Sequence, residues 1–177
     1  IAINTIQTPL VTGSASTTQG GSSVVSLVDP DTGAIIGSAV PFPGFPGEIR
    51  VVSGDFNNDG KVDIIAAAGP GGGPAIAILD SQTGEVLQSF FAFDPAFTGG
   101  VFIAVRDFNG DGILDIIVGA GAGGGPAVSV FDGRNLSVIK SFFAYAQDFT
   151  GGVSVASIDF NNDGIQDLVT GAGAGGA

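Results

Sequence analysis

Carboxylate and amide side chains recur at fixed short spacings in three nine-residue stretches of the sequence. The stretches are DFNNDGKVD (55–63), DFNGDGILD (107–115) and DFNNDGIQD (159–167), which share the pattern Asp-Phe-Asn-x-Asp-Gly-x-x-Asp. Oxygen-bearing side chains at positions 1, 3 and 5 of a tight loop can converge on one centre, and glycine at position 6 permits a turn with positive φ. Position 7 can offer its backbone carbonyl, and the aspartate at position 9 can complete the shell. The pattern therefore predicts a metal site in each stretch.

The predicted donors are all hard oxygens, with three carboxylates in each stretch. Such a set favours Ca²⁺ over Zn²⁺ or copper, and Mg²⁺ tolerates a flexible cage of many oxygens less well. We expect about three calcium ions per chain, one in each stretch. The predicted ligands are Asp55, Asn57, Asp59, Lys61 and Asp63 in the first stretch, Asp107, Asn109, Asp111, Ile113 and Asp115 in the second, and Asp159, Asn161, Asp163, Ile165 and Asp167 in the third.

The EF-hand calcium loop shares the opening of this pattern but differs in its last ligand and in its flanks. An EF-hand needs a bidentate glutamate at position 12 and a helix on either side. Position 12 here is alanine, valine or threonine, and the flanking segments have the composition of strands. A metal-free turn rich in Asp and Asn is the other alternative. Against it, all three copies keep every proposed ligand type while position 8 varies.

Charge and composition exclude several classes of function. The net charge is −12, and nine of the 17 acidic residues lie in the three stretches, where three divalent cations would halve that charge. Nucleic acid is not an expected partner, because phosphate binding needs clustered Lys and Arg. The chain has no Cys and no His, so disulfides, thiol nucleophiles and histidine-based triads are excluded. Paired carboxylates could serve a glycosidase, but each clustered aspartate is better used as a metal ligand, and we expect no enzyme.

The acidic stretches are parts of a longer repeat, since Asp55, Asp107 and Asp159 lie 52 residues apart. Apolar runs separated by Gly-rich breaks predict four short strands per repeat, and nothing has helical periodicity. Four strands in about fifty residues, repeated, is typical of β-propeller blades; a parallel β-solenoid usually has a shorter period. We therefore expect an all-β chain of four-stranded antiparallel blades. In the second repeat the strands are expected at 99–105, 113–120, 126–132 and 136–145.

The two ends of the chain fall at nearly the same phase of the repeat, because LVTG occurs at both 10–13 and 168–171. We expect one repeat domain over 1–177, with three blade-equivalents and complementary half-blades at the two ends. The start supplies third and fourth strands (22–29, 33–40), and the end supplies first and second strands (151–159, 165–171). Self-association through these half-blades, as a ring or a filament, is a predicted partnership. The expected divisions are 1–54 (partial), 55–106, 107–158 and 159–177 (partial).

The acidic loops and the Gly-rich tracts together resemble the FG-GAP repeat, the blade unit of the integrin α-subunit propeller and of many secreted bacterial proteins. The tracts AAAGPGGGP (66–74) and GAGAGGGP (119–126) take the place of that family's Gly-Ala-Pro element, and FTGG (97–100, 149–152) that of its Phe-Gly element. The resemblance implies a calcium-binding hairpin loop between the first two strands of each blade. It further implies a non-enzymatic module with a structural or adhesive role, extracellular or at the cell surface.

Two other functions are compatible with the sequence. The chain could be a self-assembling subunit of a surface filament or appendage, joined head-to-tail through its half-blades. It could also be a carbohydrate-binding propeller attached to a secreted hydrolase, with SFFAF (89–93) and SFFAY (141–145) as a sugar-stacking platform, although packing between blades is the simpler role for these rings. A protein or glycan ligand is a candidate partner in each case. No membrane span is expected, because every apolar run is far shorter than the ~20 residues required.

Overall fold

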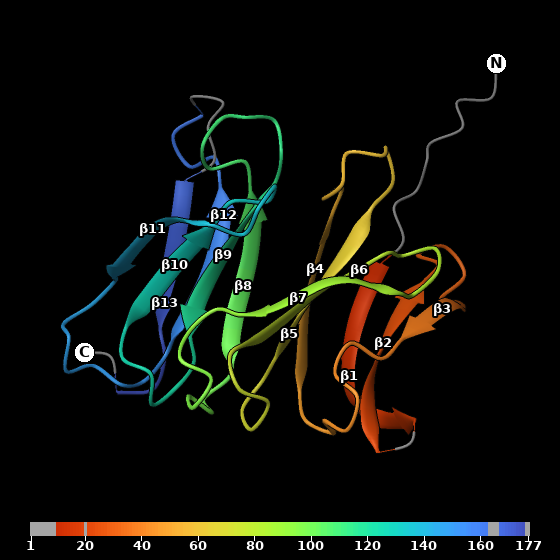
Figure 1. Cartoon of the computed structure of the whole chain (residues 1–177), viewed down its shortest axis with the longest axis horizontal. Coiled ribbons are helices and arrows are strands. Elements are labelled where there is room, and N and C mark those ends of the chain that lie inside the picture. Colours follow the sequence, from red (N-terminus) through yellow and green to blue (C-terminus); the bar gives the residue numbers. More distant parts are fainter. Residues whose placement is uncertain (1–9, 20, 163–166, 176–177) are drawn as a thin grey trace.

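The computed structural model describes residues 10–19, 21–162 and 167–175, which form β-strands, turns and loops (Figure 1). Thirteen strands in this part of the chain make four antiparallel sheets. Within the described residues, no helix is long and apolar enough to cross a membrane. The strands are β1 (Leu10–Gln19), β2 (Ser22–Val28), β3 (Ile35–Ala39), β4 (Ile49–Gly54), β5 (Asp63–Ala68), β6 (Ala75–Leu79), β7 (Val86–Phe91), β8 (Val101–Arg106), β9 (Asp115–Ala120), β10 (Ala127–Phe131), β11 (Val138–Phe143), β12 (Val153–Ile158) and β13 (Asp167–Ala172).

The two central sheets are complete blades of the expected kind. Their strand orders are β4-β5-β6-β7 and β8-β9-β10-β11, so each strand pairs with its neighbour in sequence. The four strands expected in the second repeat are confirmed as β8 to β11, with ends that differ by a few residues. All six residues of β5 and of β9 are buried. This agrees with their near-continuous apolar sequences, because each strand lies inside its sheet and is covered on both faces.

The sheets pack face to face through their apolar residues, and Figure 1 shows them beside one another with the N-terminal sheet at one end. The first strands of successive blades, β4, β8 and β12, lie next to one another. Between the two complete blades, Ile65 and Ile76 pack against Val101 and Ile116, all fully buried. Phe90 of β7 meets Phe131 of β10 at 5.0 Å between ring centroids. The expected packing between blades is therefore confirmed for Phe90, whereas its neighbour Phe91 is exposed.

The N-terminal sheet differs from the expected half-blade. Third and fourth strands were expected there, and β2 and β3 occupy those places, but β1 adds a strand on the other side of β2. The C-terminal sheet has first and second strands, β12 and β13, as expected. Each terminal sheet therefore already has a strand at the position of a blade's second strand, β1 in one and β13 in the other. If two chains joined their half-blades, β13 of one chain would have to pair with the edge of β2 in the other, and β1 occupies that edge.

Glycine residues let neighbouring blades approach backbone to backbone. Gly71 N donates to Thr98 O at 2.8 Å, and Gly123 N donates to Thr150 O at the same distance one repeat later. Gly100 has φ +71°, and a Cβ atom there would collide with the backbone of Gly69 in the preceding blade. Only glycine combines this conformation with this lack of space. The Gly-rich tracts therefore allow close packing between blades.

Candidate metal centre

Each acidic stretch forms the hairpin loop between the first two strands of its sheet. The loops join β4 to β5, β8 to β9 and β12 to β13, and the aspartate at position 9 is already the first residue of the second strand. The first two loops are described in full. In the third loop, the predicted ligands Asp163 and Ile165 lie outside the described residues.

In the first loop, side-chain oxygens from positions 1 and 3 meet at one backbone nitrogen. Asp59 N donates to Asp55 Oδ1 at 3.1 Å and to Asn57 Oδ1 at 2.9 Å. Gly60 N, at φ +82°, donates to Asp55 Oδ2 at 2.9 Å. Lys61 N donates to Asp59 Oδ1 at 2.8 Å, which holds position 7 against position 5. The loop is thus wound around its own acidic side chains, as such turns require.

The second loop repeats these four hydrogen bonds. Asp111 N donates to Asp107 Oδ1 at 3.0 Å and to Asn109 Oδ1 at 2.9 Å. Gly112 N donates to Asp107 Oδ2 at 2.8 Å, and Ile113 N to Asp111 Oδ1 at 2.9 Å. Because two loops of different sequence at positions 4, 7 and 8 share these four bonds, the common Asp, Asn and Gly residues determine the conformation.

The aspartate at position 9 has a structural role that the sequence reasoning missed. Asp63 and Asp115 are 3% and 0% exposed, respectively. Asp115 Oδ2 accepts from Phe108 N at 2.8 Å and from Asn109 N at 3.2 Å, and its Oδ1 accepts from Gly133 N at 3.0 Å. The signal for burial was in the sequence, because this aspartate directly precedes the apolar residues of the second strand. It ties the start of the loop to the sheet through these hydrogen bonds.

The other loops use position 9 in the same way. Asp63 Oδ2 accepts from Phe56 N at 3.1 Å, and Asp167 Oδ2 accepts from Phe160 N, also at 3.1 Å. The phenylalanine at position 2 packs the first loop against the core, since Phe56 is 6% exposed. Phe160, at the same position of the third loop, is 80% exposed. No sheet of the described residues follows β12 and β13 to cover it.

Burial and hydrogen bonding move the pKa values of two loop carboxyls in opposite directions. Burial raises the pKa of Asp63, and the negative charges of Asp59 and Asp55 add to this effect against the hydrogen bonds from Phe56 and Asn57. Burial would also raise the pKa of Asp107, but the backbone N–H groups that it accepts from outweigh burial and lower the pKa. A nearby cation would stabilise the charged form of both groups.

The turn between the third and fourth strands of each blade reaches the acidic loop. In the first blade, Lys61 Nζ donates to Gln82 Oε1 at 2.8 Å. In the second, Arg134 Nε lies 2.9 Å from Asp111 Oδ2, and Asn109 Nδ2 lies 3.4 Å from Asp132 Oδ2. These turn residues were not among the predicted site residues. Gln82 and Arg134 occupy the same position of successive repeats. Their contacts with the acidic loop could not be predicted from this spacing, because they depend on how the two hairpins of a blade pack together.

The loops supply the chemistry of a calcium site without a preformed acidic cage. Over residues 10–19, 21–162 and 167–175, no three acidic side chains are gathered closely enough to hold a metal ion. The donor set nevertheless fits Ca²⁺, because every predicted ligand presents oxygen, and positions 1 and 3 converge on a single nitrogen. An ion would have to draw the carboxylates of positions 1, 5 and 9 together. In doing so it would neutralise charge that is now balanced mainly by backbone N–H groups.

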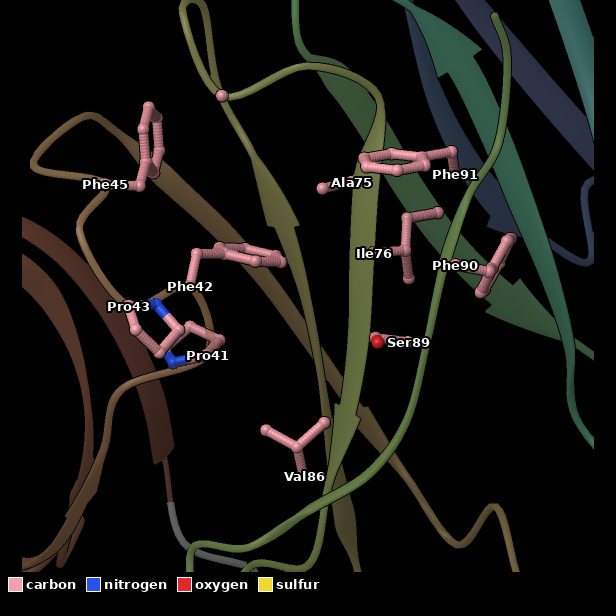
Figure 2. Close-up of a pocket in the computed structure, with 11 residues that line it drawn as sticks. Pro41, Phe42, Pro43, Phe45, Ala75, Ile76, Val86, Ser89, Phe90 and Phe91 are labelled. Carbon is pink, nitrogen blue, oxygen red and sulfur yellow. The ribbon is translucent and has the colours of Figure 1, made fainter. Parts of the chain in front are cut away.

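A second feature is an apolar pocket between the loop that joins β3 to β4 and the sheet β4-β5-β6-β7 (Figure 2). Its volume is about 630 Å³, and Ser89 has the only polar side chain among its lining residues. The second phenylalanine of SFFAF, Phe91, is 56% exposed beside it. Only one side-chain hydroxyl, that of Ser89, is available in the pocket to bind a sugar. Carbohydrate binding stays a prediction. The lining residues are Pro41, Phe42, Pro43, Phe45, Gly72, Ala75, Ile76, Val86, Ser89, Phe90 and Phe91.

Comparison with known proteins agrees with the geometry of the loops. The family model described as FG-GAP-like repeat matches residues 55–118 and 107–170, and each match begins at the first aspartate of a loop. Integrin alpha-V of Gallus gallus is 37% identical over 83 residues, which cover 46% of this chain and 8% of that protein. The chain therefore spans less than a tenth of the length of this relative.

Proposed function

Because the chain belongs to the family of FG-GAP-like repeat proteins, we propose that it is a non-enzymatic, calcium-binding β-propeller module. Its role is structural or adhesive, outside the cell or at the cell surface. The observation that carries the proposal is the repeated loop, in which oxygens of positions 1 and 3 meet at the nitrogen of position 5 in two loops described in full. The relationship to an integrin subunit supports the extracellular placement.

In this proposal the residues of the first loop provide different oxygen ligands to the ion. Asp55, Asn57 and Asp59 offer side-chain oxygens, Lys61 offers its backbone carbonyl, and Asp63 offers a carboxylate from the start of β5. The second and third loops use the equivalent residues. Bound Ca²⁺ supplies positive charge that neutralises the aspartates and stiffens the hairpin. Sites in extracellular modules bind calcium with dissociation constants of roughly 10⁻⁴–10⁻³ M, so the ion would be a structural part rather than a switch.

The proposal also accounts for the clustered acids without catalysis. Each aspartate of the first two loops accepts hydrogen bonds from the loop itself, and the ones at position 9 are buried. A general acid needs access to the substrate, and a carboxylate nucleophile needs an oxygen that is not already held by hydrogen bonds. These carboxylates are better suited to hold a loop and an ion than to react.

Equilibrium dialysis against calcium should give about three bound ions per chain, because the sequence has three loops of the same pattern. Asp55→Asn and Asp107→Asn should each remove one ion, since position 1 provides both of its oxygens to its loop. Asp94→Asn, in a loop between β7 and β8, is the control and should leave the count unchanged. Binding of fewer than one ion per chain at millimolar calcium would contradict the proposal.

Self-assembly is a second candidate function, and the C-terminal sheet favours it. Ile158, Phe160 and Val169 are exposed there. The residues one repeat before Val169 and Phe160 are Ile117, which is fully buried, and Phe108, which is partly buried against the core. In the complete blades the following sheet covers these places. A second chain could provide that cover with the outer face of its N-terminal sheet, without the strand exchange that β1 blocks.

Sedimentation of the chain without added ligand should then show dimers or longer assemblies. Val169→Asp should abolish them, because it places a charge in the covered interface. Val86→Asp is a matched control, since Val86 and Val169 are each 44% exposed but Val86 lies on the outer strand β7. A monomer at all concentrations, or equal effects of the two substitutions, would rule out association through this sheet.

A further inference from the structure

We propose that Arg134 acts as a built-in competitor of the calcium ion at the second loop, so that this loop binds calcium more weakly than its own ligands would allow. The inference rests on the proposed calcium binding. It concerns how the chain's own residues set the affinity of one site. Arg134 is a positioning residue here, because it acts through a predicted ligand and donates no oxygen to the ion.

The guanidinium group of Arg134 holds Asp111 at two points. Its Nε atom lies 2.9 Å from Asp111 Oδ2, and its terminal nitrogen donates to Asp111 O at 3.1 Å. Arg134 belongs to the turn between β10 and β11, 23 residues away in sequence. The same Oδ2 atom also accepts from Asn109 Nδ2 at 3.3 Å. One of the two carboxylate oxygens at position 5 is therefore engaged by cationic and amide donors.

The first loop provides an internal comparison, because it has the same predicted acidic ligands but a different contact with the turn. Gln82 occupies the place of Arg134 one repeat earlier, and it accepts from Lys61 Nζ at 2.8 Å. The turn contact thus involves Lys61 in the first site and Arg134 in the second, and the second site also has the charge of Arg106 beside Asp107. Lys61 bonds to an amide oxygen of the turn, whereas Arg134 bonds to a carboxylate that is a predicted ligand. The two loops differ in where the positive charge lies.

Calcium at the second loop must displace or share the contact between Arg134 and Asp111. An exposed ion pair of this kind is weak, and the side chain of Arg134 is 53% exposed, so displacement alone corresponds to a factor of at most about five in affinity. Repulsion between the guanidinium and a divalent ion a few ångströms away adds to this factor, less at high salt. Together we expect a reduction of about three- to ten-fold. Without calcium, the same contact partly neutralises the loop.

Calcium titration followed by NMR can measure the two loops separately in the whole chain. The amide groups of Gly60 and Gly112 each donate to the position 1 carboxylate of their own loop, at 2.9 and 2.8 Å. Their chemical shifts should therefore report on binding at each loop. The variants are Arg134→Gln, which copies the first loop, Gln82→Arg, which copies the second, and Arg134→Lys, which keeps the charge but cannot make both contacts.

Arg134→Gln should lower the calcium concentration at the midpoint of the Gly112 shift by about three- to ten-fold and leave the Gly60 midpoint in place. Gln82→Arg should have the opposite effect and raise the calcium concentration at the midpoint of the Gly60 shift. The Gly112 midpoint of Arg134→Lys should lie between those of the wild-type chain and Arg134→Gln. An unchanged Gly112 midpoint in Arg134→Gln, with both glycines still responding to calcium, would overturn this inference and leave the proposed function standing. No response of either glycine in the wild-type chain would overturn both.

Discussion

Replacement of Asp115 by alanine should lower the free energy of unfolding by about 3–5 kcal/mol in the presence of a chelator, where no ion can contribute. The carboxylate of Asp115 is fully buried and accepts from three backbone N–H groups, those of Phe108, Asn109 and Gly133. Alanine leaves these donors without a partner where water cannot easily replace it, and each unsatisfied donor costs about 1–3 kcal/mol. Urea denaturation of both chains in chelator measures the difference.

Asp111→Ala is the matched control for this experiment, because it removes a carboxylate from the same loop at a more exposed position. Asp111 accepts from Ile113 N and pairs with the exposed Arg134, so its loss should cost only about 1 kcal/mol in chelator. In calcium, Asp111→Ala should lose most of the stabilisation that the ion provides at this loop. Equal losses for the two variants in chelator would contradict the structural role assigned to position 9.

The strands and the loops could be predicted from sequence because their signals are local. The apolar run within 113–120 predicts a strand buried on both faces, and β9 is such a strand. The Asp, Asn and Gly residues at fixed places in 107–115 select their own hydrogen bonds within the loop, which are short-range contacts of two to seven residues. Local chemistry of this kind does not depend on the rest of the fold.

The contacts that the sequence did not predict are those that cross between hairpins. Asp115 reaches Gly133, 18 residues away, and Arg134 reaches Asp111, 23 residues away. Both depend on how the turn after β10 lies over the loop before β9, which no spacing of residue types specifies. The strand β1 was missed for another reason. Residues 10–19 are rich in Ser and Thr, and their pairing with β2 shifts register between Ser14 and Thr18.

Saturating calcium should raise the free energy of unfolding by about 2.7 kcal/mol for each loop when its concentration is 100 times the dissociation constant. Three loops, each at this degree of saturation, would together add about 8 kcal/mol. For a chain of this size, 1 kcal/mol corresponds to roughly 2–4 °C in melting temperature, so a rise of about 15 °C or more is expected. The physical reason is neutralisation, since nine aspartates of a chain with net charge −12 lie in these loops.

Thermal unfolding in calcium, in magnesium and in chelator, all at the same ionic strength, is the measurement that tests calcium binding by the loops most directly. Matched ionic strength removes general screening as a cause of any difference. A chain with Asp55→Asn, Asp107→Asn and Asp159→Asn together serves as the control. We predict a large rise in melting temperature with calcium, a smaller rise with magnesium, and little response of the control. Equal melting temperatures of the wild-type chain in calcium and in chelator would mean that the loops are turns without an ion.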